Sequence, residues 1–201
     1  MPNLTRTQST GLSCGAACLL VAARELGIQS FTIPPQVINA TVSTPSRTLN
    51  FGTDPEVDIE KAIYNVTARH KNGYSMPADI GKCAKFMGLD PTVHMSGCIV
   101  PKALMAFYPD AAAQCATEGV PVVGSDPGAL TSTQRQLCAV GMIGGLHWVL
   151  YRPDGTYMDP ASGENFNYFV SLGQGPGYLI KYIDTGIYIV VDSAAGVAAG
   201  P

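Results

Sequence analysis

Helix signals and strand signals occupy different parts of this chain, and this separation limits the possible fold more than any other feature. Asp54-Pro55, Pro77 and Asp110 are typical helix starts, and Gly119 is a typical helix end. From Val120 onward, β-branched and aromatic runs alternate with turn residues, which is typical of strands. Helices followed by strands predict an α+β fold, in which an N-terminal helical part packs on a C-terminal antiparallel sheet.

The individual elements follow from the same signals. Helices are expected over 55–70, from 77 and over 110–119, and strands over 120–124, 137–143, 146–152, 156–159, 178–183 and 187–191. Asp184-Thr185-Gly186 predicts a hairpin between the last two strands. The polar, turn-rich stretches Pro34-Pro35 and Ser43–Thr53 are expected to form a loop that faces the substrate.

The first helix is predicted between Ser13 and Gly27. Ser13 is a good N-cap, Gly27 suits the left-handed residue after a helix end, and strong helix formers lie between them. Cys14 then opens the helix, where unpaired N–H groups and the positive end of the helix dipole stabilise a thiolate. Cys18 lies one turn deeper and is expected to face the core. This arrangement favours Cys14 as a nucleophile.

Gln8 precedes Cys14 by six residues, in a polar loop that can fold back over the helix start. Its side-chain amide and the backbone N–H of Cys14 would supply two donors for a tetrahedral oxyanion. Taken alone, Cys14 is explained equally well as a small buried residue, and Gln8 as a solvated loop residue. A metal site at Cys14 and Cys18 is disfavoured, because the chain offers no second pair of ligands at suitable spacing.

A hairpin is predicted around Pro153-Asp154-Gly155. Proline first and glycine last favour a three-residue loop, in which Val149 faces Asp159 across the two strands. Because side chains alternate, Asp159 then lies diagonal to His147 on one face, roughly 5–8 Å away at the backbone. A two-residue Asp-Gly loop, which the sequence also allows, would place Asp159 on the opposite face.

His147 is the best candidate for a base among three histidines. His70 lies near a helix end, where a solvated or dipole-paired role is expected, and His94 lies in a short strand with only Asp90 nearby. A lone strand histidine is structural about three times in four. The Gln-Cys and His-Asp elements support each other, however, and this reverses those odds. Trp148, on the other face of the strand, is expected to anchor the core.

These segments resemble the papain-like (clan CA) thiol peptidases. The resemblance is closest to the bacteriocin-processing, double-glycine peptidases and to related bacterial effector toxins. In that branch a glutamine precedes a Cys-Gly-x-x-Cys helix start by six residues. A later strand begins with His-Trp/Phe-Val-Val or a similar run, and an Asp-Pro follows on the next strand. The corresponding segments are Gln8, Cys14-Gly15-Ala16-Ala17-Cys18, His147-Trp148-Val149-Leu150 and Asp159-Pro160.

The resemblance covers roughly residues 5–185 and implies a papain-like fold. It implies that Cys14 is the nucleophile, His147 the base, Asp159 the residue that orients the base, and Gln8 the oxyanion-hole donor. Ser13 stands where many members carry aspartate, which leaves the substrate-side environment open.

The function expected from this chemistry is a protease that cleaves a specific protein, delivered as a toxin or effector by a bacterial secretion system. The same thiol chemistry would also serve a glutamine deamidase. A catalytically silent binding module on a papain-like scaffold is the third hypothesis. The expected partners are a protein substrate and a protective immunity protein, and no cofactor or metal is implied.

Composition limits the remaining choices. With 201 residues, 46% hydrophobic and 13% charged, the chain fits one domain over residues 1–192, followed by an Ala/Gly-rich tail over 193–201. A net charge of −3 without basic runs disfavours nucleic acid as a partner, and no apolar stretch is long enough for a membrane helix.

We expect no signal peptide, and hence synthesis in the bacterial cytoplasm, export by a specialised system and action in a target-cell cytoplasm. Reduced thiols are expected at Cys14, Cys18, Cys83, Cys98, Cys115 and Cys138.

Overall fold

The computed structural model describes residues 3–38, 42–68, 73–96, 110–142, 145–167 and 182–193. The described helices are α1 (Cys14–Glu25), α2 (Glu56–Thr67), α3 (Pro77–Phe86) and α5 (Ala111–Thr117). The described strands are β1 (Ser30–Ile33), β2 (Gln36–Ile38), β3 (Val42–Thr44), β4 (Arg47–Asn50), β5 (Leu89–Met95), β6 (Val122–Val123), β7 (Gln134–Met142), β8 (Gly145–Tyr151), β9 (Tyr157–Asp159), β10 (Glu164–Phe166) and β11 (Ile183–Ser193). None of the helices in these ranges is long and apolar enough to cross a membrane.

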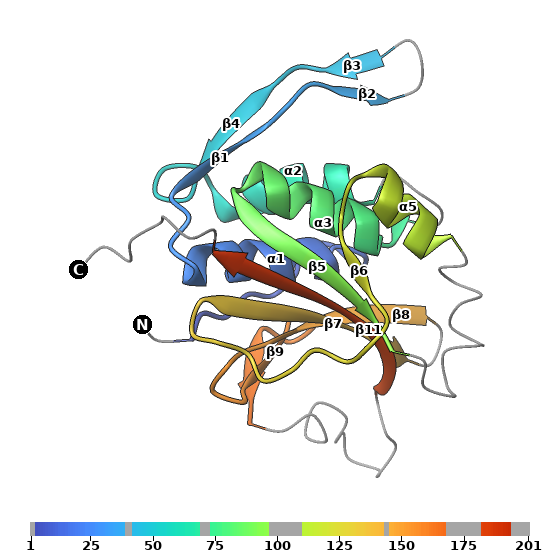
Figure 1. Cartoon of the computed structure of the whole chain (residues 1–201). Helices are drawn as coiled ribbons and strands as arrows, with labels where there is room; N and C mark the ends of the chain where they lie inside the picture. Colours follow the sequence, from blue (N-terminus) through green and yellow to red (C-terminus); the bar gives the residue numbers. More distant parts are fainter. Residues whose placement is uncertain are drawn as a thin grey trace.

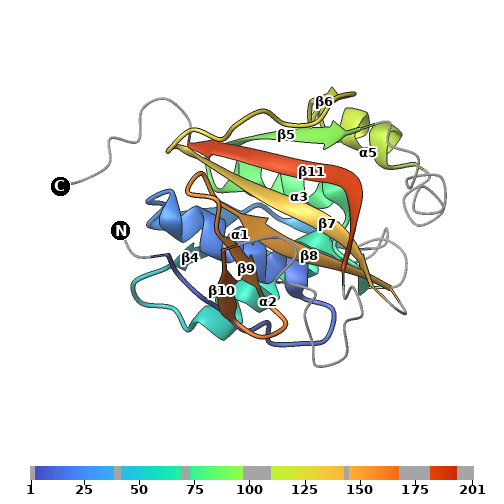
Figure 2. The ribbon, with the colours of Figure 1, turned by 90° about the horizontal axis from the view of Figure 1, so that it is seen from below.

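A seven-stranded sheet with the order β10-β9-β8-β7-β11-β5-β6 forms the centre of the molecule. Helices α1 and α3 pack on one face of this sheet (Figures 1 and 2). The expected α+β class is confirmed. Strands β7 to β11, which include the strands of His147 and Asp159, pair antiparallel as expected. The sheet as a whole is mixed, because β5 from the first half of the chain joins it and pairs in parallel with β6.

The helix boundaries agree with the sequence signals. α1 begins at Cys14, α3 begins at Pro77, and α5 follows Asp110. Gly27 and Gly119 adopt left-handed φ angles of 83° and 64°, as expected for residues that end a helix. Local chemistry therefore sets where these helices start and stop.

The hairpin expected at Asp184-Thr185-Gly186 is wrong. Residues Ile183–Ser193 form one strand, and its register against β7 shifts between Asp184 and Ile187, which marks a β-bulge. The hydroxyl of Thr185 donates to the carbonyl of Ala139 within the bulge, at 2.7 Å. A bulge and a tight turn both use a left-handed glycine, here Gly186 with φ 71°, so the sequence signal fits either structure.

The connection between α1 and α2 is a β-arm, not the expected loop. Ser30 pairs with Asn50 and Ile33 with Arg47 in one ladder, and Gln36 pairs with Thr44 in the next. In every pair the two residue numbers add up to 80, so the second ladder continues the first without a shift in register. They form a single arm that extends away from the sheet in Figure 1.

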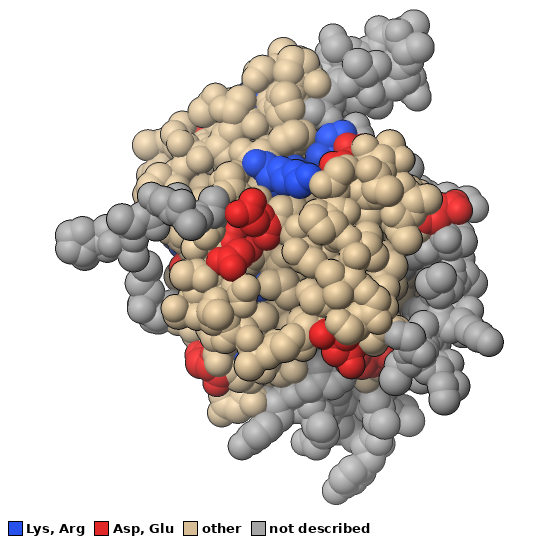
Figure 3. Space-filling view, in the orientation of Figure 1, with Lys and Arg blue, Asp and Glu red and all other residues tan. Residues whose placement is uncertain are grey.

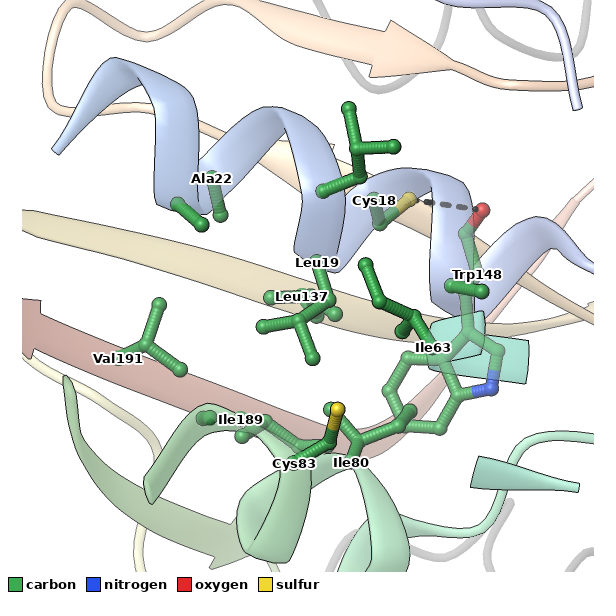
Figure 4. Close-up of a cluster of buried hydrophobic side chains, with 14 of the residues drawn as sticks. Cys18, Leu19, Ala22, Ile63, Ile80, Cys83, Leu137, Trp148, Ile189 and Val191 are labelled. Carbon is green, nitrogen blue, oxygen red and sulfur yellow. Dashed lines mark hydrogen bonds between the residues drawn. The ribbon is translucent and has the colours of Figure 1, made fainter. Parts of the chain in front are cut away.

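The main core lies between the sheet and α1, α2 and α3 (Figure 4). Trp148 is 1% exposed, and its indole N–H donates to the carbonyl of Ser75 at 3.1 Å. The thiol of Cys18 donates to the carbonyl of Trp148 at 3.5 Å, one turn into α1. The core roles expected for Trp148 and Cys18 are therefore confirmed.

The described cysteines are all free and buried, as expected for reduced thiols: Cys14, Cys18, Cys83, Cys115 and Cys138. Cys98 and His70 lie outside the described residues, as does most of the expected strand over 178–183. The division into a domain over 1–192 and a tail over 193–201 stays a prediction. Ser193 is the last residue of β11, and residues 194–201 are not among those described.

Candidate active site

A three-residue turn between β8 and β9 aligns the two strands. Leu150 pairs with Met158 and Tyr151 with Tyr157, and both pairs of numbers sum to 308. The same register sets Val149 opposite Asp159, as the sequence predicts. Gly155 closes the turn with a left-handed φ of 84°. The three-residue loop is therefore confirmed over the two-residue alternative.

His147 and Asp159 meet on this face of the hairpin. Nε2 of His147 lies 2.8 Å from Oδ1 of Asp159, and the two residues are 5% and 1% exposed. The backbone N–H of Ala161 also donates to Oδ1, at 2.9 Å. Burial opposes ionisation of Asp159, but the bonds and charge from His147 outweigh it, so the pKa of Asp159 lies below its usual value. The carboxylate is therefore charged at neutral pH.

Cys14 reaches the same imidazole from the first turn of α1. Its side chain is 2% exposed and lies close enough to His147 to raise the pKa of the imidazole. Burial lowers the pKa of His147, but the hydrogen bonds and negative charges of Asp159 and Cys14 outweigh it and raise this pKa to about 9. Because Nε2 bonds Asp159, Nδ1 is the nitrogen available to the sulfur. The imidazole is therefore protonated beside the sulfur of Cys14 at neutral pH.

Tyr182 is a residue of this site that sequence reasoning missed. Its hydroxyl donates to Oδ2 of Asp159 at 2.8 Å, and the residue is 3% exposed. Its ring stacks on the imidazole of His147. No local motif marks Tyr182, since it lies 23 positions after Asp159 in an ordinary strand-like run. Only the tertiary fold identifies it.

Gln8 lies in the loop between the two parts of the site. Its backbone N–H donates to the carbonyl of Pro160 at 2.8 Å, beside Asp159. Its side-chain amide donates to the carbonyl of Thr10 at 2.7 Å, which uses one of the two N–H groups on Nε2. The loop therefore ties the segment before Cys14 to the residue after Asp159. The oxyanion role of Gln8 stays a prediction.

A buried carboxylate from α2, Glu60, fixes this loop and was also missed by sequence reasoning. Glu60 is 0% exposed. Its Oε1 accepts hydrogen bonds from the backbone and hydroxyl of Ser9 and from the hydroxyl of Ser13, all between 2.7 and 2.8 Å. Its Oε2 pairs with the guanidinium of Arg6 at 2.6 Å. Ser13 occupies the expected N-cap position, but its hydroxyl bonds Glu60 in place of a helix N–H.

The other titratable candidates make no hydrogen bond to His147 or Asp159 among those found between described residues. His94 is on β5, which β11 and β7 separate from β8, and its Nδ1 lies 3.0 Å from the carbonyl of Ser125. Burial raises the pKa of the Cys18 thiol well above its usual value, and it raises the pKa of Cys115 to about 11. These thiols therefore stay protonated at neutral pH. Among the described cysteines only Cys14 adjoins a histidine–carboxylate pair.

Comparison with known proteins agrees with this chemistry. Residues 6–194 match the model of a family described as "Invasion plasmid antigen J, cysteine protease". A similar protein is the cysteine protease IpaJ of Shigella flexneri, which is 37% identical over 208 residues. That match covers 96% of this chain and 79% of the Shigella protein. No solved structure matches.

Proposed function

The chain belongs to the invasion plasmid antigen J family of cysteine proteases, and on this premise we propose that Cys14, His147 and Asp159 form its catalytic triad. Family membership makes the chain a cysteine peptidase. One observation carries the proposal: the imidazole of His147 bonds the carboxylate of Asp159 and lies close enough to the sulfur of Cys14 for Cys14 to raise the pKa of the imidazole. The triad joins a helix start to a strand of the sheet, which supports a papain-like arrangement.

The proposed reaction has two steps. The thiolate of Cys14 attacks the carbonyl carbon of the scissile amide, and a C–S bond forms as the carbonyl oxygen becomes an oxyanion. His147 gives its proton to the leaving amine, the C–N bond breaks, and a thioester remains on Cys14. Water then attacks the thioester and passes a proton to His147, which releases the acid and restores the ion pair.

The remaining residues support these steps. Asp159 holds the imidazole in orientation and offsets its positive charge. We propose that the backbone N–H of Cys14 and the second amide N–H of Gln8 form the oxyanion hole. The bond from Gln8 to Pro160 supports this assignment, because it holds the glutamine backbone next to Asp159.

We further propose that the chain is a bacterial effector or toxin that cleaves a specific protein inside a target cell. The family description, an invasion plasmid antigen, supports export from the bacterium by a specialised secretion system. A reducing cytoplasm would keep the thiol of Cys14 active. If the protein is toxic to its producer, an immunity protein is the expected partner, and co-expression of that partner should restore growth.

Paired cysteine variants test the catalytic proposal. Wild type, Cys14→Ala and Cys18→Ala are expressed in a host cell, and new protein N-termini are identified by mass spectrometry. We expect Cys14→Ala to remove all new termini while the protein stays folded, and Cys18→Ala to keep them. Loss of cleavage in Cys18→Ala alone would overturn the assignment. A gain of about one dalton on glutamine, without new termini, would identify the deamidase alternative.

A further inference from the structure

A pocket of about 500 Å³ lies on the sheet face that carries His147. Its walls come from β7, β8, β9, β11 and the chain that follows β6. Tyr151, Tyr157 and Tyr188 supply aromatic rings, and Asp126 and Asp184 supply carboxylates. Its volume is within the range of roughly 300–1,000 Å³ typical of ligand sites in proteins.

The strand register sets the position of this pocket relative to the catalytic residues. His147 and Tyr151 are four residues apart on β8, so their side chains point to the same face. At about 3.3 Å per residue, they lie roughly 13 Å apart along the strand. An extended peptide covers this distance with about four residues. A substrate segment that binds at both the thiol and the pocket therefore needs about four residues between the two points.

The chemistry of the pocket favours a positive charge. Rings of Tyr151 and Tyr157 lie with centroids 4.6 Å apart, and tyrosine faces attract cations. Asp126 and Asp184 are exposed, and no Lys, Arg or His is among the described residues that line the pocket. In Figure 3, which has the orientation of Figure 1, a group of acidic side chains lies at the lower edge of the molecule.

Asp184 keeps the capacity to bind a ligand. Its Oδ2 accepts the hydroxyl of Tyr188 at 2.6 Å, and its Oδ1 accepts the backbone N–H of Gly186 at 2.9 Å. A carboxylate offers about four acceptor sites, so two remain for an incoming donor. These two internal bonds hold the carboxylate and the ring of Tyr188 in a fixed relation at the pocket wall.

We propose that this pocket binds a lysine or arginine side chain of the protein substrate, about four residues from the cleaved bond. The inference rests on the proposed function, because it places the scissile bond at Cys14. The two carboxylates neutralise the cationic group while the tyrosine rings contact its aliphatic stem and its charge.

Cleavage of a proteome-derived peptide library tests the pocket. Purified wild type should show enrichment of Lys and Arg at one position about four residues from the cut. For a peptide pair that differs only by arginine or norleucine there, the Asp126→Asn/Asp184→Asn double variant should lower kcat/KM about tenfold for the arginine peptide alone. Asp126→Lys should shift the preference at that position toward Glu and Asp.

Controls separate failure of the pocket from failure of the triad. Asp90→Asn changes an exposed carboxylate on β5 that does not line the pocket, and it should keep the wild-type preference. If iodoacetamide labels Cys14 and peptides are cut without a preference for Lys or Arg, the pocket inference is wrong and the triad stands. An apolar or aromatic preference there, or a Lys/Arg preference that survives the double variant, also overturns the pocket. If no peptide is cut, or cutting persists in Cys14→Ala, the proposed function fails and this inference fails with it.

Discussion

The ring of Tyr182 lies against the imidazole of His147, with ring centroids 5.3 Å apart and planes inclined by 21°. The hydroxyl of the same tyrosine donates to Oδ2 of Asp159, while His147 bonds Oδ1. Tyr182 thus contacts both His147 and Asp159, the base and the orienting carboxylate of the proposed triad. The orientation of the imidazole therefore depends on the segment just before β11 as well as on the β8–β9 hairpin.

Tyr182→Phe should weaken catalysis while leaving the fold intact, because it removes the hydroxyl and keeps the ring against His147. A hydrogen bond to a charged group contributes about 1.5–3 kcal/mol, so we expect kcat/KM to fall by about tenfold or more. Without this donor, the charge of Asp159 acts more strongly on His147, so the basic limb of the pH profile should move to higher pH. In Tyr182→Leu, which also loses the ring contact, kcat/KM should fall further. An unchanged kcat/KM and pH profile in Tyr182→Phe would show that the hydroxyl of Tyr182 does not support catalysis.

Activity should decline as the pH rises through about 9, the pKa to which Asp159 and Cys14 raise His147. Above that pH the imidazole loses the proton that it must give to the leaving amine. Asp159→Asn removes a charge that raises this pKa, so the basic limb of kcat/KM should move to lower pH. We expect kcat/KM itself to fall by about 10²–10⁴-fold. A basic limb at the same pH in wild type and Asp159→Asn would contradict the pairing of His147 with Asp159.

The same pKa shift affects stability. The pKa of His147 is raised in the folded protein above its ordinary value of 6.5. Its contribution to the free energy of unfolding is therefore complete below about pH 6.5 and is lost as the pH rises through about 9. Urea unfolding of wild type and Asp159→Asn across this window measures the effect, which should be smaller in the variant.

Glu60→Gln should destabilise the loop that leads to Cys14. The substitution removes a buried charge that pairs with Arg6, and breaking a buried pair lowers the free energy of unfolding by roughly 3 kcal/mol. Glu56→Gln is the matched control, because Glu56 pairs with the same Arg6 but has a side chain that is 39% exposed. We expect that variant to lose less than about 1 kcal/mol and little activity. If the two variants lose the same free energy of unfolding, measured with urea, and the same kcat/KM, the special role of Glu60 is contradicted.

Gly15→Ala should destabilise α1 through a contact with Ser75. A Cβ at Gly15 would lie 2.6 Å from the Cβ of Ser75, and overpacking of this kind costs about 1–3 kcal/mol. Alanine gains about 1 kcal/mol in helix propensity over glycine, which offsets only part of that cost. In a Ser75→Gly background the same change should become close to neutral or stabilising. Thermal unfolding of the four proteins measures the coupling, and additive effects would exclude the clash.

Features encoded by neighbouring residues could be predicted from the sequence. Proline and glycine positions set the helix boundaries and the turn before β9, and this turn brings Asp159 to His147. Cys14 was placed at a helix start by the residues around it. These signals act over a few residues, so they do not depend on how the chain packs.

Features that arise from distant packing could not be predicted. Glu60 meets Ser13 across 47 positions, and in the sequence it is one of several acidic residues on a helix. Tyr182 has no motif of its own. The bulge at Gly186 carries the same local signal as a turn, and only pairing with both β5 and β7 makes β11 continuous. Pairing between β1 and β4 likewise makes an arm from residues that suggest a loop.

The turn Pro153-Asp154-Gly155 makes the hairpin length a requirement of the proposed triad. Strand side chains alternate, so one codon inserted or deleted there would turn Asp159 away from His147 and leave every triad residue present in the gene. Relatives that differ in the length of this surface segment are therefore expected to lack activity, or to carry a second, compensating change nearby, even when their key amino acids align perfectly.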